Sequence, residues 1–153
     1  MPHIHEKIDF CSEVFVVYKD KVLIRKHDKA GAWIGVGGHV ELDEDPNTTA
    51  IREVKEEVGL DIVLLSPRSL PKDEDLYKQL IPPWYVRHNS ISNSTHIHID
   101  LIYFATSNSD AVVPEKPTDE WKWFSFEDLE KNEVGMSEHV LFYAREALTL
   151  LGK

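Results

Sequence analysis

The spacing of apolar residues along the chain first predicts its strands. Residues 13–28, EVFVVYKDKVLIRKHD, contain two β-branched, apolar runs around a short polar turn, which is typical of a β-hairpin. The aliphatic segment LDIVLL at 60–65 predicts a short buried strand, and STHIHIDLIYFAT at 94–106 predicts a longer strand with mixed faces. The segment EWKWFSF at 120–126 is expected to form a last strand. Residues from about 66 to 93 contain several prolines and many polar side chains, so we expect a long surface excursion there.

Helices are predicted where apolar residues recur every three or four positions between suitable end residues. A helix is expected from about Pro46 to Val58, because Asp45 can cap its N-terminus and Gly59 fits the left-handed position beyond its end. On a helical wheel its core-facing positions are Ala50, Ile51, Val54 and Val58. A short helical turn is expected after Ser125, and a final helix after Ser137. The apolar positions of that final helix are Val140, Leu141, Ala144, Ala147, Leu148 and Leu151.

Composition narrows the class of protein and its partners. A chain of 153 residues with 42% hydrophobic residues has the size and balance of one soluble domain. The net charge of −10 would repel a phosphate backbone, so polymeric nucleic acid is not an expected partner. The sequence contains no long apolar run and no signal peptide, so we expect no membrane partner and a cytoplasmic location. The single cysteine, Cys11, is expected to be structural.

The predicted helix 46–58 concentrates negative charge. Glu53, Glu56 and Glu57 are three or four residues apart, so their carboxylates share one face and repel each other. Arg52 and Lys55 are the cations of this helix, and neither lies at the centre of the glutamate face on the wheel. Clustered carboxylates are the hard ligands that Mg²⁺ and Mn²⁺ prefer, so a divalent metal is the expected counter-charge. A solvated acidic face is the alternative.

A calcium-binding loop is another alternative, because Asp43, Asp45 and Asn47 match the first three ligand positions of an EF-hand. The later positions disagree, since Thr48 replaces the glycine and Val54 replaces the glutamate that such a loop needs. The sequence therefore argues against this interpretation.

The residues around the acidic helix resemble the signature of the Nudix hydrolases at every specified position. The matching residues are Gly38, Glu44, Arg52, Glu53, Val54, Glu56, Glu57, Gly59 and Leu60. Two flanking positions depart from the usual pattern: Val36 stands where proline is frequent, and Asp43 where glycine is frequent. The resemblance implies an α+β fold, namely an α/β/α sandwich with a mixed sheet, a catalytic loop and helix, and a C-terminal helix. It also implies one Nudix domain over residues 1–153.

The resemblance further implies a Mg²⁺-dependent pyrophosphohydrolase, with Mn²⁺ as a substitute, that cleaves a nucleoside diphosphate linked to another group. Glu56 and Glu57 correspond to metal ligands, and Glu53 to a further ligand or the general base. The carbonyl of Gly37 corresponds to an added ligand. Glu120 is either one more ligand or base, or an ordinary surface charge. A non-catalytic Nudix-like module that binds a nucleotide and regulates a partner is the alternative, although such modules commonly lack one or more of these acids.

The other positions of the signature have supporting roles in this interpretation. Glu44 and Arg52 are expected to form an ion pair that fixes the loop to the helix. Gly37 and Gly38 are expected to allow close backbone approach to the metal site. Gly59 ends the helix.

The sequence leaves the substrate open among nucleoside triphosphates, dinucleoside polyphosphates, ADP-ribose and nucleotide sugars, with the first two favoured. Tyr77 lies at a distance after the signature that is seen in dinucleoside polyphosphate hydrolases. Trp84 or Tyr85 could stack on a base, or could simply pack. Arg25 could donate to a phosphate, or could be a surface residue.

Two further features are left open. In HIHID, His96, His98 and Asp100 share one face of a strand, which fits either a transition-metal site or polar residues facing solvent. A homodimer is compatible with the sequence but is not indicated by any motif.

Overall fold

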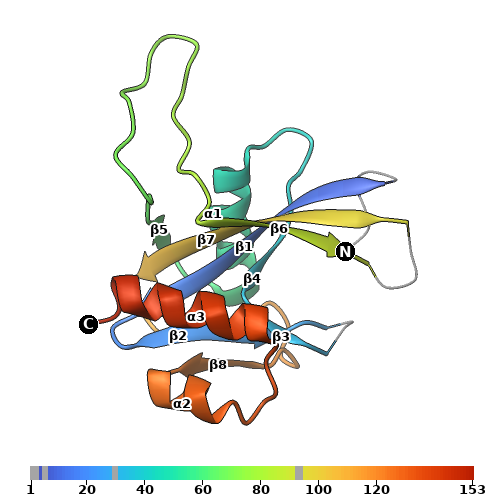
Figure 1. Cartoon of the computed structure of the whole chain (residues 1–153), viewed down its shortest axis with the longest axis vertical. Helices are drawn as coiled ribbons and strands as arrows, with labels where there is room; N and C mark the ends of the chain where they lie inside the picture. Colours follow the sequence, from blue (N-terminus) through green and yellow to red (C-terminus); the bar gives the residue numbers. More distant parts are fainter. Residues whose placement is uncertain (1–3, 5–6, 29–30, 92–94) are drawn as a thin grey trace.

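A computed structural model of the chain describes residues 4, 7–28, 31–91 and 95–153. Within these residues, eight strands form one mixed sheet with the order β3-β2-β1-β7-β5, while β4 pairs with β1, β6 with β7 and β8 with β2 (Figure 1). The strands are β1 (Ile8–Tyr18), β2 (Lys21–Lys26), β3 (Trp33–Ile34), β4 (Val36–His39), β5 (Ile62–Leu64), β6 (Tyr85–Ser90), β7 (Ile97–Ser107) and β8 (Trp121–Phe124).

The centre of the sheet is the pair β1 and β7. These two long strands are parallel, and their register runs from Ile8 opposite Ile97 to Val17 opposite Thr106. The predicted hairpin is confirmed, because β1 and β2 pair antiparallel with Val16 opposite Leu23. The sheet is therefore mixed, as expected.

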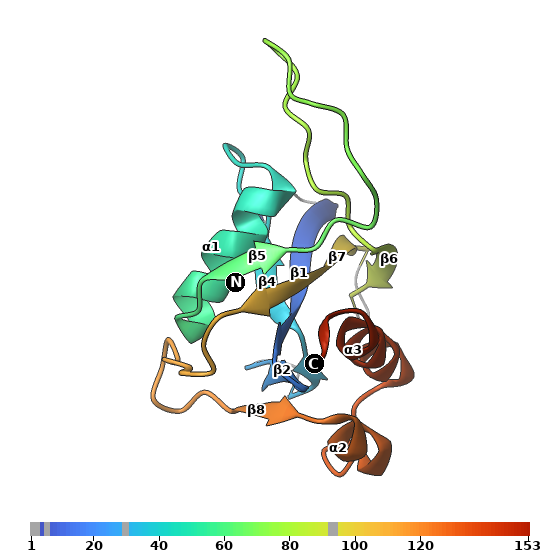
Figure 2. The ribbon, with the colours of Figure 1, turned by 90° about the vertical axis from the view of Figure 1, so that its left-hand side faces the viewer.

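Three helices are described: α1 (Pro46–Val58), α2 (Phe126–Lys131) and α3 (Glu138–Leu151). The bounds predicted for α1 are confirmed, with the Asp45 side chain accepting from the Thr48 N–H and Gly59 in the left-handed conformation at φ 71°. Ser125 and Ser137 cap α2 and α3 as predicted. Figure 2 shows α1 on one side of the sheet and α3 on the other, which confirms the α/β/α sandwich.

The sheet separates two apolar cores, because neighbouring residues of a strand point to opposite faces. On the α1 face, Val14 and Val16 of β1 pack with Ala50, Val54 and Val58 of the helix. On the α3 face, residues of β1, β2 and β7 pack with Val140, Leu141, Ala144, Ala147 and Leu148. Of the four residues predicted to face the core from α1, Ile51 is an exception, since it is 47% exposed.

The predicted surface excursion begins correctly but ends too late. Residues 66–84 project from the sheet as the long green loop of Figure 1, whereas Tyr85–Ser90 form β6 along β7. The sequence did not predict β6, because its apolar and polar residues are placed opposite to the usual pattern: Val86 is exposed, whereas Arg87 is partly buried. The segment at 60–65 is likewise only partly buried: β5 pairs with β7 at the edge of the sheet, and Val63 is 71% exposed.

The polar face of HIHID does not point to solvent, so that expectation is wrong. Asp100 is buried, and its carboxylate accepts from Arg87 Nη2 at 2.8 Å. The same nitrogen donates to Glu13 at 3.1 Å. His96 is also buried, with its Nε2 3.0 Å from the carboxylate of Asp9. These polar groups are accommodated in the interior because they satisfy one another.

No helix among the described residues combines the length and the apolar composition needed to cross a lipid bilayer.

The cap of α1 gives a test of the fold. Replacement of Asp45 by alanine removes the acceptor for the Thr48 N–H and should lower the free energy of unfolding by about 1 kcal/mol. The expected fall in melting temperature is about 3 °C, measured by circular dichroism. Asp43→Ala, in the exposed loop just before the cap, is the control and should leave the melting temperature unchanged. Equal melting temperatures for both variants would contradict the capping role.

Candidate active site

The candidate site begins at the glycine-rich strand β4, which pairs with β1. Gly37 lies opposite Glu13 in the antiparallel register, and a Cβ atom at this position would overlap the carbonyl oxygen of Ser12. Glycine is therefore required by the close approach of two strands, quite apart from any metal. The next element, α1, contacts β4 and places its glutamates beside it.

Arg52 ties the loop before α1 to the helix. Its Nη2 donates to Glu44 Oε1 at 2.6 Å and its Nε to Glu44 Oε2 at 3.0 Å, which is the bidentate ion pair that the sequence predicts. The Thr49 hydroxyl and the Glu41 N–H also donate to this carboxylate, at 2.7 and 3.1 Å. Hydrogen bonds from Arg52 above all lower the pKa of Glu44 to about 2. The carboxylate of Glu44 is thus held ionised.

Arg52 also lies closer to the acidic cluster than the helical wheel suggested. Its Nη1 is 3.0 Å from Glu53 and 3.2 Å from Glu56, and its Nη2 donates to the carbonyl of His39 at 3.4 Å. Arg52 therefore contacts two of the glutamates, although it does not lie at the centre of their face on the wheel. From its position beside the glutamate face, the long side chain of Arg52 reaches the carboxylates of Glu53 and Glu56 on α1. It also reaches Glu44 in the loop before the helix.

Glu57 is the most constrained acid of the cluster. Its carboxyl group is buried beside that of Glu53, and its Oε2 lies 2.8 Å from Arg25 Nη1. The contact with Arg25 does not have hydrogen-bond geometry, so Glu57 Oε2 is buried without a hydrogen bond. Burial outweighs the charge of Arg25 and, with the neighbouring Glu53, raises the pKa of Glu57 to about 9.

These features fit a divalent cation. Two buried carboxyl groups in contact, Glu53 and Glu57, can hold one proton between them or can share a metal ion in its place. Glu57 Oε2 contacts one cation, Arg25 Nη1 at 2.8 Å, but has no hydrogen-bond partner, so it can also serve as a ligand. Glu56 adds a more exposed carboxylate on the same helix. The residues present therefore suit Mg²⁺ or Mn²⁺, whose preferred ligands are oxygens.

Two acids outside the signature also belong to this site. Asp119 is buried and lies 3.6 Å from Arg25 Nη2, and the backbone N–H of Glu115 donates to the carbonyl of Glu57 at 3.1 Å. The negative charge of Glu115 contributes to the raised pKa of Glu57. Both come from the irregular segment between β7 and β8, where no periodicity indicates which residues approach the site. Asp45 and Gly59 could be recognised by local rules, whereas these two acids could not.

Arg25 is buried among acids. It pairs with Glu57, Asp119 and Asp28, the last at 3.5 Å from Nη2. Its expected contact with a phosphate stays a prediction. Beside it, a cleft of about 370 Å³ is lined by Lys26, His27, Asp28, Lys116, Thr118, Asp119 and Glu120.

Glu120 lies at the rim of this cleft, immediately before β8. Its carboxylate is 3.1 Å from Lys26 Nζ and is mostly exposed. The structure therefore shows a surface ion pair, and the role of Glu120 as an additional ligand or base stays a prediction.

The three aromatic residues proposed for substrate binding do not meet the acidic cluster. Tyr77 is 71% exposed in the projecting loop, where it pairs with Glu74. Trp84 stacks on Phe104 at 5.4 Å between ring centroids, on the face covered by α3. The Tyr85 hydroxyl donates to Glu146 of α3 at 2.6 Å. Packing, the alternative that the sequence left open, accounts for the positions of both Trp84 and Tyr85.

The fold and the site together define a class: an α/β/α sandwich with a carboxylate centre suited to a divalent cation. The model of the NUDIX domain matches residues 13–145. The chain therefore belongs to the Nudix hydrolase family, and the resemblance noted in the sequence is confirmed.

Individual relatives support this assignment. A NUDIX-family hydrolase from Clostridium perfringens is 38% identical in sequence and superposes with a TM-score of 0.80, covering 93% of this chain and 97% of that protein. The Ap4A hydrolase of C. elegans is 17% identical with a TM-score of 0.66, covering 95% and 99%, and shows the fold alone. The dihydroneopterin triphosphate diphosphatase of Haemophilus influenzae is 35% identical over 75 residues, which are 49% of this chain and 46% of that protein.

The Glu44–Arg52 pair gives a test that depends on pH. Because the pKa of Glu44 is lowered in the folded state, its stabilising effect is present above the unfolded-state pKa of about 4.3 and is lost as pH falls toward 2. Glu44→Gln should lower the free energy of unfolding at pH 7 by on the order of 2 kcal/mol. The difference from the wild type should shrink below about pH 4, as measured by urea denaturation at several pH values.

The control is Glu41→Gln, since the side chain of Glu41 is exposed and should contribute little. A loss of stability in Glu44→Gln that stays constant from pH 7 to pH 2 would contradict the ion-pair account.

Proposed function

We propose that this protein is a Mg²⁺-dependent pyrophosphohydrolase, with Mn²⁺ as a substitute, that cleaves a nucleoside diphosphate linked to another group. The observation that supports this most directly is the pair of buried, neighbouring acids Glu53 and Glu57 on one face of α1. A helix built only for packing gains nothing from two buried acids in contact, because each must be desolvated. The pair is therefore best explained by a function that needs negative charge at this point.

The metal would be held by Glu53, Glu56 and Glu57, with the carbonyl of Gly37 as an added ligand. When bound, Mg²⁺ supplies positive charge that offsets the charge of the pyrophosphate oxygens. The chain's own residues set the geometry: Arg52 holds Glu53 and Glu56, and through Glu44 it fixes the loop that leads into α1. This preorganisation means that the acids do not have to be brought together when the substrate binds.

Proton transfer is assigned to Glu53. In place of a role as the third ligand, its carboxylate would act as the general base and accept the proton of the attacking water beside Glu57. Arg25 contacts Glu57 from β2 and keeps a positive charge at the same point. It is proposed to orient the phosphate as well, from its position beside the cleft lined by Asp119 and Lys116.

Nucleoside triphosphates and dinucleoside polyphosphates are the favoured substrate classes. The relative from Haemophilus influenzae is named for a triphosphate that it cleaves as a diphosphatase, although only 49% of this chain matches it. ADP-ribose and nucleotide sugars complete the panel to be tested. We further propose that residues 1–153 act as one domain in the cytoplasm on small molecules, without a membrane or polymeric nucleic acid as partner.

The decisive variant is Glu57→Gln, which keeps the shape of the side chain and removes its charge. Turnover of the best substrate with Mg²⁺ should fall about 10²- to 10⁴-fold, because a ligand or base is lost. The measurement is release of phosphate or pyrophosphate over a panel of nucleotides, dihydroneopterin triphosphate and nucleotide sugars. Removal of Mg²⁺ with a chelator should abolish turnover by the wild type.

Glu127→Gln on α2 is the matched control, because it removes one glutamate that pairs with Lys131 at the surface. Its turnover should equal that of the wild type. If the wild type binds nucleotides but cleaves none of the panel in Mg²⁺ or Mn²⁺, the protein is instead a non-catalytic nucleotide-binding module. Full turnover by Glu57→Gln would remove Glu57 from the metal site.

A further inference from the structure

A second group of metal-ligating side chains lies on the α3 face of the sheet, opposite the face that carries the carboxylates of α1. Cys11 of β1 and His39 of β4 are direct neighbours in the antiparallel register of these strands. His98 of β7 lies on the other side of β1, opposite Asp9 in the parallel register. Cys11 lies on the same face of β1 as Phe15 and Val17, which belong to the apolar core under α3. The cluster therefore lies on the α3 face, next to this core.

The side chains of this cluster converge. One ligand atom from each of Cys11, His39 and His98 lies within 4.8 Å of the other two. His39 Nε2 is 3.3 Å from His98 Nε2, and their ring centroids are 4.9 Å apart. In a tetrahedral zinc site with Zn–N bonds of about 2.05 Å, two nitrogen ligands are separated by roughly 3.3 Å. The spacing of the two imidazoles therefore already matches that of a pair of ligands.

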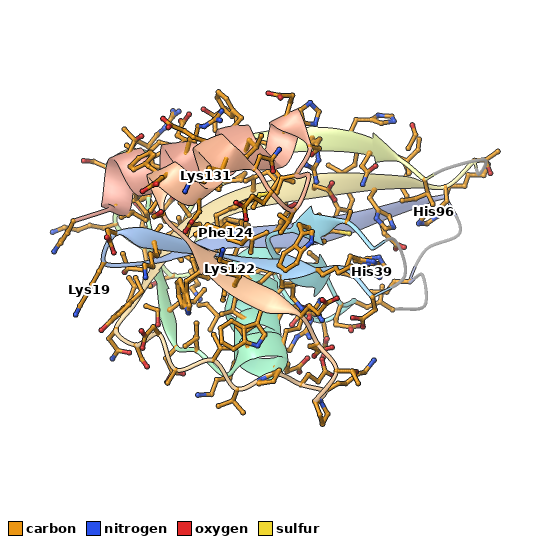
Figure 3. The ribbon with its side chains drawn as sticks, turned by 90° about the horizontal axis from the view of Figure 1, so that it is seen from below. Lys19, His39, His96, Lys122, Phe124 and Lys131 are labelled. Atoms are coloured by element: carbon orange, nitrogen blue, oxygen red, sulfur yellow. The ribbon has the colours of Figure 1, made fainter. Side chains whose placement is uncertain are left out.

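A carboxylate–imidazole pair stands beside the cluster. Asp9, His96 and His98 also place one ligand atom each within 4.8 Å of one another, and His96 Nε2 is 3.0 Å from Asp9 Oδ2. Figure 3 shows His39 and His96 at the same end of the sheet, although they come from different elements. Partners of this kind orient metal-binding histidines and balance the charge of the ion.

The chemistry of this group differs from that of α1. Thiolate and imidazole are ligands for zinc and its neighbours among the transition metals, whereas Mg²⁺ prefers oxygen. In the absence of a metal, the contact between the two imidazoles is a single hydrogen bond that requires complementary tautomers.

From this geometry we propose that Cys11, His39 and His98 bind one transition-metal ion of the zinc class, separate from the Mg²⁺ site, with the Asp9–His96 pair supporting His98. The ion would join β1, β4 and β7 at one end of the sheet. It would also hold β4 next to the catalytic loop, because the backbone carbonyl of His39 accepts from Arg52 at 3.4 Å. The proposed role is structural, and it does not depend on the activity proposed above.

The test is a titration of the metal-free full chain with Co²⁺, followed by absorbance, and with Zn²⁺ in competition with a chromophoric chelator. The wild type should bind one equivalent, with a near-ultraviolet thiolate-to-cobalt charge-transfer band, and Zn²⁺ should raise its melting temperature. Cys11→Ser should lose the band, and His98→Asn should weaken Zn²⁺ binding more than 100-fold. Asp9→Asn should weaken it about 10- to 100-fold, as expected for a residue that supports a ligand.

Two variants serve as controls, and circular dichroism confirms that each variant is folded. His139→Asn removes an exposed histidine of α3, and Glu57→Gln alters the carboxylate site; both should bind Zn²⁺ like the wild type. The proposal is overturned if the wild type shows no charge-transfer band and no competition for Zn²⁺. It is equally overturned if folded Cys11→Ser and His98→Asn retain full affinity, or if Glu57→Gln abolishes binding.

Discussion

Burial of Glu57 against Glu53 is the constraint on which the rest of the candidate site depends. Two carboxyl groups in contact repel when both are ionised, and the interior offers little solvent to screen them. Arg25 from β2 and Arg52 from α1 itself supply positive charge, yet burial still raises the pKa of Glu57 to about 9. Glu57 is therefore protonated at neutral pH in the absence of a metal, and a divalent ion could take the place of that proton.

The central strands serve both faces of the sheet with different chemistry. Gly37 of β4 packs closely against β1, and on the α1 face Glu44 fixes the loop before α1 to Arg52. On the α3 face, the same strands carry the thiol and imidazoles of Cys11 and His39. His39 links the two faces, since its side chain belongs to one cluster and its carbonyl accepts from Arg52 of the other.

Local rules predicted much of the fold. Asp45 and Gly59 fix the ends of α1 through hydrogen bonds within a few residues, so its bounds could be read from the sequence. Strand β6 could not be predicted from the sequence, because Arg87 turns inward to pair with Asp100 and Glu13, which are distant in sequence. The same long-range pairing reverses the expected orientation of the polar face of HIHID. Hydrophobic periodicity assumes that polar side chains face water, and it fails where they satisfy one another inside.

The candidate site was likewise predictable only in part. The acids of α1 and the Glu44–Arg52 pair follow from spacing within one motif, whereas Asp119 and Glu115 reach the site from an irregular segment whose path depends on the whole sheet. Arg25 was noticed in the sequence, but its partners are acids from three separate segments. Contacts between distant segments are set by the tertiary fold, and one sequence does not encode them as a pattern.

The central claim is that the acidic cluster is tolerated for the sake of a metal and not for stability. It is tested most directly by thermal unfolding of the wild type and of Glu57→Gln, each with a chelator and with 10 mM Mg²⁺. The account predicts that Glu57→Gln is at least as stable as the wild type in chelator, and that Mg²⁺ stabilises only the wild type, by about 1 kcal/mol for millimolar affinity. A less stable Glu57→Gln in chelator that is stabilised by Mg²⁺ as much as the wild type would contradict it.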